Sequence, residues 1–145
     1  MGKNFSCNNV DGKRKVSDFY ETPYGLTRLF LDQGLFNKDL RILEPAAGDG
    51  AIVRVLDEYG FSGIDSYDIQ GGTNFLHHEG TVPQIITNPP FSIAYEFVMK
   101  AKQVATHRFA FLLPLSYLHG KQRFDHIWQD KEYPLRRVYV FTRYP

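Results

Sequence analysis

The sequence predicts an α/β fold in which a mostly parallel, twisted sheet is flanked by helices. Short apolar runs suited to strands alternate along the chain with longer segments of helical periodicity. The run at residues 109–113 is apolar throughout, which is typical of a parallel strand buried on both faces. Turns rich in glycine or proline follow two of the apolar runs, as they do where parallel strands lead into ligand-binding loops.

The first half of the chain is predicted to contain two helices and two strands. The first helix begins at Thr22-Pro23, with proline in its first turn, and ends at Gly34. Its apolar face is formed by Leu26, Leu29 and Phe30. Next come a buried strand at 41–44, a helix at 51–59 with Gly60 as its C-terminal cap, and a strand at 63–68.

The second half continues the alternation of strands and helices. A strand at 84–87 is halted by two prolines, because proline lacks the N–H that a sheet ladder needs. The elements predicted after it are a helix at 93–104, the strand at 109–113, a helix at 120–129 and a last strand at 138–141.

The composition fits one compact domain. The chain has 145 residues, of which 43% are hydrophobic and 23% charged. Cys7 is the only cysteine, which excludes an internal disulfide and a multi-cysteine zinc site, and the histidines show no metal-ligand spacing. No apolar run approaches the ~20 residues that span a bilayer, so we expect a cytoplasmic protein that does not contact membranes.

The charges are unevenly distributed. Net charge is only +1, and residues 1–16 form a polar segment that we expect to be a flexible tail. From Lys100 onward basic residues outnumber acidic ones. This excess suits a nearby phosphate backbone, although a solvated basic face is equally compatible with the charge pattern.

A turn of small residues lies between the strand at 41–44 and the helix that follows it. Ala46, Gly48 and Gly50 let the backbone turn tightly and approach a ligand closely. Glu44 ends the strand with an acid, which suits a ligand bearing an ammonium group. Asp68, 24 residues later, ends the next strand, where a carboxylate can accept hydrogen bonds from ribose hydroxyls.

The second chemical signal is Asn88-Pro89-Pro90-Phe91, which follows an apolar strand. The prolines keep the backbone extended, so that carbonyl oxygens face the cleft. The Asn88 side-chain oxygen and the Pro89 carbonyl can accept both N–H bonds of an exocyclic amine. Phe91 offers a flat face on which a planar base can stack, an interaction that contributes ~1–3 kcal/mol per base elsewhere.

Together these motifs resemble those of the class I S-adenosylmethionine-dependent methyltransferases that modify N6 of adenine in DNA, especially small bacterial and phage-encoded enzymes. Residues 17–23 are similar to the family's N-terminal cofactor motif, 44–50 to its glycine-rich motif and 88–91 to its catalytic motif. This order matches the gamma subclass. The resemblance covers residues 17 to about 115 and implies a Rossmann-like catalytic domain, which we place at residues 17–145. The chain departs from many relatives in offering no separate target-recognition domain, and its sheet is expected to lack the last strand of the family's sheet.

The resemblance also implies a role for each matching residue. The catalytic residues would be Asn88, Pro89, Pro90 and Phe91. S-adenosylmethionine would contact Tyr20, Thr22, Pro23, Glu44, Pro45, Ala46, Gly48, Gly50, Asp68, Ile69, Asn74 and Phe75. In the family an Asp-Phe pair contacts the cofactor's adenine amino group, and this chain has Asn74-Phe75 there, which keeps an acceptor oxygen but loses the charge.

The partner expected from this resemblance is DNA. RNA and protein glutamine remain alternative substrates because both present a comparable NH2 group, and Phe91 favours nucleic acid where glutamine-modifying relatives prefer Tyr. A noncatalytic nucleic-acid-binding module with the same fold is a further alternative. With no recognition domain, sequence specificity would come from short loops such as 117–123, from a homodimer formed through the sheet edge or a partner subunit, or be weak.

Overall fold

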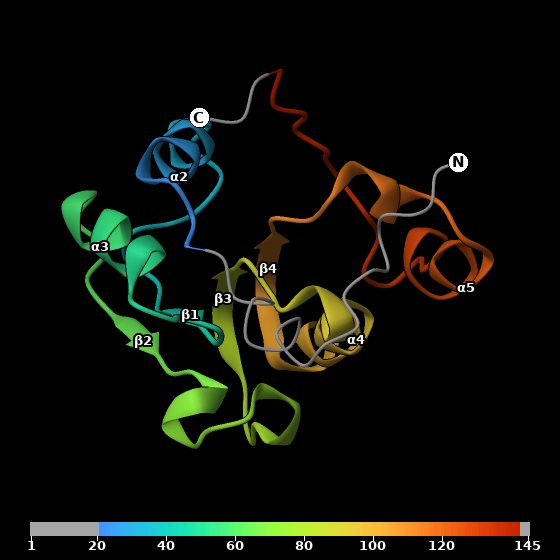
Figure 1. The fold of residues 1–145 in the computed structure, drawn as a ribbon, viewed down its shortest axis with the longest axis horizontal. Coiled ribbons are helices and arrows are strands. Elements are labelled where there is room, and N and C mark those ends of the chain that lie inside the picture. The colour runs from blue at the N-terminus through green and yellow to red at the C-terminus, as the bar shows by residue number, and fades with distance from the viewer. Residues whose placement is uncertain (1–20, 143–145) are drawn as a thin grey trace, which may run out of the picture.

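The computed structural model describes residues 21–142 of the chain. The expected tail at 1–16 and the part of the N-terminal motif that contains Tyr20 lie outside the described residues. Figure 1 shows an open sheet with helices α2 and α3 on one side and α4 on the other. The described residues therefore form an α/β fold that is compatible with a Rossmann-like arrangement.

The sheet has four strands in the order β2-β1-β3-β4, and every pairing is parallel. Its strands are β1 (Ile42–Glu44), β2 (Ile64–Ser66), β3 (Val82–Thr87) and β4 (Ala105–Phe111). The helices that connect or flank them are α2 (Tyr24–Leu31), α3 (Ala51–Glu58) and α4 (Ala94–Val104). Because all strands run in one direction, the loops after β1, β2 and β3 leave the sheet at the same edge.

Each face of the sheet has its own hydrophobic core. On one face, β1 and β3 pack against α2 and α3 through Leu31, Ile42, Ile52, Val55, Leu56, Phe61 and Ile86. On the other, they pack against α4 and the 3-10 turn Phe75–His77 through Leu43, Phe75, Val82, Ile85, Phe97, Ala101, Val104 and Ala105. Adjacent strand residues alternate between the two clusters, as the pleat requires.

A buried glutamine attaches a loop to the sheet. The side chain of Gln84 is fully buried in β3. Its Oε1 accepts a hydrogen bond from the Asn37 N–H at 2.7 Å, and its Nε2 donates to the Asn37 carbonyl at 2.9 Å. One amide thereby satisfies both backbone groups of a residue in the connection between α2 and β1.

The predicted strand at 138–141 is wrong. This segment is extended but pairs with no strand among the described residues, and Val138, Tyr139 and Val140 are 40–61% exposed. Its β-branched and aromatic residues favour a strand, but strand structure needs a paired neighbour as well as propensity. Tyr139 instead forms an edge-to-face contact with Phe30 of α2, with ring centroids 5.8 Å apart.

The strand predicted at 109–113 also differs from β4. Strand β4 begins four residues earlier, at Ala105, and ends at Phe111. Phe109 and Phe111 are half-buried rather than buried on both faces, because β4 lies at the edge of the described sheet. The helix predicted at 120–129 is divided into a short α-helical turn, α5 (Lys121–Arg123), and a π-helical segment, Phe124–Trp128.

The remaining predicted elements are present with adjusted ends. Helix α2 begins one residue after Pro23, which occupies the N-cap, and Leu29 is 54% exposed rather than part of the buried face. Strand β3 begins at Val82 and includes Pro83, where the pairing with β4 shifts its register. That irregularity accommodates the proline, which donates no ladder hydrogen bond.

We expect Gln84→Leu to lower the free energy of unfolding by about 1–3 kcal/mol, because it leaves the Asn37 N–H and carbonyl without their partner. Chemical denaturation followed by circular dichroism measures this change. The matched control is Gln33→Leu, whose side chain bonds the Leu29 carbonyl at the surface and whose loss should cost less than ~0.5 kcal/mol. Equal effects of the two variants would contradict the role given to Gln84.

Candidate functional site

The candidate site lies at the carboxyl edge of the sheet, where three loops meet. The glycine-rich turn follows β1, Asp68 follows β2, and Asn88 to Phe91 follow β3. The residues just before α2 join them, because Thr22 is buried and bonded to Asn88. The structure therefore brings together four segments that are widely separated in the sequence.

Glu44 is the buried acid of this site. It ends β1, and its side chain is only 2% exposed. One carboxylate oxygen accepts a hydrogen bond from the Ala46 N–H at 2.8 Å. The Thr87 hydroxyl is buried nearby without a hydrogen bond of good geometry, but it is close enough to favour the charged carboxylate.

Burial outweighs these favourable contacts and raises the pKa of Glu44 from 4.5 to about 8. The nearby Asp68 carboxylate adds to the increase, since two negative charges repel each other. Glu44 is therefore largely protonated at neutral pH. A cation bound beside it would favour the charged form and remove part of the cost of burying it.

Asp68 connects the glycine-rich turn to the end of β2. Its Oδ2 accepts from the Gly48 N–H and its Oδ1 from the Gln70 N–H, both at 2.8 Å. Gly48 and Gly50 have positive φ angles of 54° and 91°, a conformation that glycine adopts without steric cost. The carboxylate thus fixes the shape of the turn, and each oxygen keeps a further lone pair for a ligand.

The residues before α2 and the Asn88–Phe91 loop are directly connected. The Asn88 side-chain Nδ2 donates to the Thr22 hydroxyl at 3.1 Å, across 66 residues of sequence. This amide therefore joins the loop after β3 to the residues that precede α2. The same loop places Pro89 in a buried position and leaves Phe91 37% exposed.

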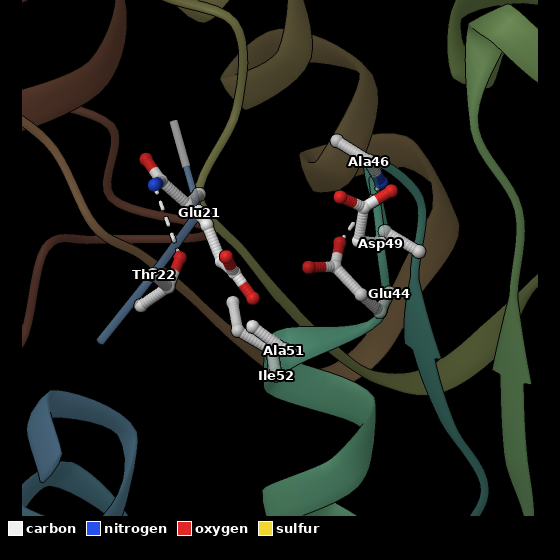
Figure 2. Close-up of a pocket in the computed structure, with 9 residues that line it drawn as sticks. Glu21, Thr22, Glu44, Ala46, Asp49, Ala51 and Ile52 are labelled. Atoms are coloured by element: carbon white, nitrogen blue, oxygen red, sulfur yellow. Dashed lines mark hydrogen bonds between the residues drawn. The ribbon is translucent and has the colours of Figure 1, made fainter. Parts of the chain in front are cut away.

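A narrow acidic cleft lies between these residues. It is lined by Glu21, Thr22, Glu44, Ala46, Ala47, Asp49, Ala51, Ile52 and Asn88. Figure 2 shows the carboxylates of Glu21, Glu44 and Asp49 around this cleft, with Thr22, whose hydroxyl accepts from Asn88, at one side. The cavity volume inside the cleft is about 10 Å³, room for about one water molecule and far below the ~300 Å³ at which small-molecule sites usually begin.

The other residues predicted to contact a cofactor differ in their exposure and contacts. Ile69 is 52% exposed beside Asp68, so its side chain can cover a flat ring. Asn74 accepts a hydrogen bond from the Leu76 N–H through its side-chain oxygen, which caps the short turn that follows. Phe75 is 1% exposed and packs against Phe97 with ring centroids 5.0 Å apart. The structure thus places Phe75 in the core, whereas Asn74 and Phe75 contacts with a cofactor stay predictions.

Pro23 and Pro45 each follow a residue that lines the cleft. Pro23 caps α2 directly after Thr22, and Pro45 is buried directly after Glu44. Both restrict the backbone next to a side chain that lines the cleft. Gly50 serves as the N-cap of α3.

Sequence patterns did not single out several residues that line the cleft. Glu21, Asp49 and Ile52 contribute to it, and the Thr87 hydroxyl acts on Glu44 from β3. The only available signals were their positions next to recognised motifs. Their burial and proximity depend on strand pairing, which the linear sequence does not specify.

A scan against models of known protein families found no match, and a search of curated proteins found none either. Among residues 21–142, no group of three or more His, Cys, Asp or Glu side chains could hold a metal ion. Over the same residues no helix is both long and apolar enough to cross a membrane.

We expect Glu44→Gln to flatten the pH dependence of stability. Between pH 4.5 and about 8, folded Glu44 is protonated while the unfolded chain is ionised at this position. The unfolded state therefore binds fewer protons, and the wild-type free energy of unfolding falls as pH rises through this window, by at most ~1.4 kcal/mol per pH unit. Urea titrations of both proteins at several pH values measure the difference.

The matched control for this experiment is Asp49→Asn, which removes a carboxylate from an exposed position lining the same cleft. The free energy of unfolding of this variant should fall with rising pH as steeply as that of wild type. If Glu44→Gln and wild type show parallel curves from pH 4.5 to 8, the raised pKa of Glu44 is refuted.

Proposed function

We propose that this protein is an S-adenosylmethionine-dependent methyltransferase that transfers a methyl group to N6 of adenine in DNA. The observation that carries the proposal is the acidic cleft between the glycine-rich turn and the Asn88 amide. It combines a site for a cationic ligand with an adjacent acceptor for an amine.

The cleft residues fit the methionine end of this cofactor. S-adenosylmethionine carries an ammonium group and a sulfonium, and the cleft presents the carboxylates of Glu21, Glu44 and Asp49. Asp68 supports ribose binding, because it has free lone pairs beside Ile69, whose exposed side chain can cover the adenine ring. The cleft is too small to enclose the whole cofactor, so only its charged end would meet the cleft, and the nucleoside end would lie along the exposed surface near Asp68.

The cofactor supplies an electrophilic methyl group on a good leaving group, so the protein's main task is alignment. The Asn88 oxygen and the Pro89 carbonyl would accept the two N–H bonds of the target amine and direct its lone pair. Phe91, 37% exposed, would stack on the base. In duplex DNA the base must first leave the stack at a cost of a few kcal/mol, which these contacts would offset.

Asn88→Ala should abolish methyl transfer while leaving S-adenosylmethionine affinity within about twofold of wild type, because the side chain contacts the amine and not the charged groups of the cofactor. Calorimetry measures the affinity. Incubation with methyl-labelled cofactor and with DNA, RNA and protein in parallel, followed by nucleoside and amino-acid analysis, measures transfer. Gln70→Ala, an exposed change near Asp68 that leaves the backbone N–H in place, serves as a control.

The location of the label decides between substrates. Label in N6-methyladenine of DNA supports the proposal, whereas label only in RNA or only in glutamine assigns the enzyme to another substrate. Nucleic-acid binding without detectable cofactor binding would identify a noncatalytic module. Loss of cofactor affinity in Asn88→Ala as severe as the loss of transfer would contradict the role of Asn88.

Cofactor affinity should rise with pH between about 6 and 7.5. Free Glu44 has a pKa of about 8, and pairing with an ammonium group requires its charged form, so binding must release a proton in this range. Calorimetry in buffers of different ionisation enthalpy measures the released proton. In Glu44→Gln the affinity should be lower and nearly independent of pH, while Asp49→Asn should keep the wild-type slope. An unchanged slope in Glu44→Gln would exclude Glu44 from the pairing.

A further inference from the structure

Arg123 is held in a fixed orientation in the segment that follows β4. This segment comprises the 3-10 turn Leu115–Leu118, α5 and the π-helical residues Phe124–Trp128. The Arg123 Nε donates to the carbonyls of Tyr117 and His119, each at 2.8 Å. Its guanidinium carbon lies 4.5 Å from the centre of the Tyr117 ring. These contacts hold the base of the guanidinium and leave its terminal NH2 groups for another partner.

The surroundings of Arg123 contain more hydrogen-bond donors than acceptors. The Tyr117 hydroxyl and the Trp128 Nε1 are buried without a hydrogen-bond partner, and their rings meet edge to face with centroids 6.2 Å apart. Burial raises the pKa of Tyr117 to about 12, so its hydroxyl carries a proton at neutral pH. Buried donors of this kind are costly unless a ligand or water satisfies them.

No carboxylate neutralises Arg123 in the part of the chain that the structure describes. The four ion pairs found there involve Arg28, Arg41, Lys102 and Lys121. Lys121 is paired with Asp125 and is therefore a weaker site for an anion. The Glu96 carboxylate lies near enough to influence Tyr117, and it is the acidic group that an anion here would face.

The position of this cluster connects it with the catalytic motif. Strands β3 and β4 are parallel neighbours, so the segment after β4 leaves the sheet at the same edge as Asn88 to Phe91. Tyr117 interacts electrostatically with Tyr95 and Glu96 in the first turn of α4, which follows directly after the turn Phe91–Ile93. A nucleic acid whose base stacks on Phe91 would therefore bring its backbone across this segment.

We propose that Arg123, held by the Tyr117 and His119 carbonyls, binds a backbone phosphate of the nucleic-acid substrate next to the catalytic motif. The inference rests on the proposed function for the identity of the substrate. Phosphate oxygens accept hydrogen bonds, and their spacing suits the two NH2 groups of a guanidinium. Arg123 is thus a substrate-positioning residue that reads the backbone without reading the base sequence.

The test is equilibrium binding of fluorescein-labelled oligonucleotides by anisotropy, with duplex DNA, single-stranded DNA and RNA in separate arms and with several salt concentrations. We expect Arg123→Gln to weaken nucleic-acid binding about tenfold and to reduce the salt slope by about one. Arg41→Gln is the control, because this exposed arginine precedes β1 at the opposite edge of the sheet. It should change neither quantity.

A second variant tests the orientation rather than the charge. Gly120 has a φ of +117°, and a Cβ there would lie 2.9 Å from an Arg123 NH2 nitrogen. Gly120→Ala retains every charge but displaces the guanidinium, so it should also weaken binding, in a protein whose thermal unfolding shows that it is folded. Wild-type affinity in Arg123→Gln, equal weakening by Arg41→Gln, or no nucleic-acid binding by wild type would each overturn the proposal.

The two proposals fail in different ways. S-adenosylmethionine affinity measured on Arg123→Gln should equal that of wild type, because Arg123 does not line the acidic cleft. Nucleic-acid binding that depends on Arg123, in a protein without methyl transfer, would contradict the proposed function and leave the phosphate site standing. Methyl transfer with wild-type efficiency and wild-type substrate affinity in Arg123→Gln would support the proposed function and refute the phosphate site at Arg123.

Discussion

Strand β1 is paired in parallel on both sides, and the rest of the structure depends on this pairing. Its neighbours β2 and β3 run in the same direction, so the residues that end all three strands meet at one edge. Glu44 ends β1 with a side chain that the sheet buries. The parallel pairing of β1 with β2 and β3 therefore brings three features together: the buried Glu44, the turn held by Asp68 and the loop that contains Asn88.

The electrostatics of the edge follow from the same pairing. Three carboxylates line the cleft, while one of them, Glu44, is kept protonated by burial. Burial makes the charged form of Glu44 unfavourable, and a cationic ligand bound beside it would offset that cost. The acid is thus already in place before such a ligand binds, which is a form of preorganisation. On the other side of the Asn88–Phe91 loop, the Arg123 segment has the opposite character, because it offers donors and positive charge. The two regions therefore suit ligands of opposite charge.

The sequence predicted the alternation of strands and helices because local signals mark it. Pro45 ends β1, and the prolines after Asn88 end β3, each at a position where a ladder N–H is missing. Glu44 and Asn88 were predicted as site residues for the same reason, since they occupy strand ends. The contact between Thr22 and Asn88, the Gln84 bonds to Asn37 and the cleft position of Asp49 depend on tertiary arrangement and could not be read from neighbours in the sequence. The strand predicted at 138–141 failed because propensity indicates a strand only where a partner is in register.

The strand order has a consequence for how the chain folds during synthesis. Strands β1 and β2 are adjacent both in sequence and in the sheet, so they and α3 can form one unit before the rest of the chain is made. Strand β3 must then add to the opposite side of β1, and β4 adds to β3. Growth therefore proceeds outward from β1 toward β4, and the core beneath α2 and α3 is completed only when Ile86 of β3 joins it.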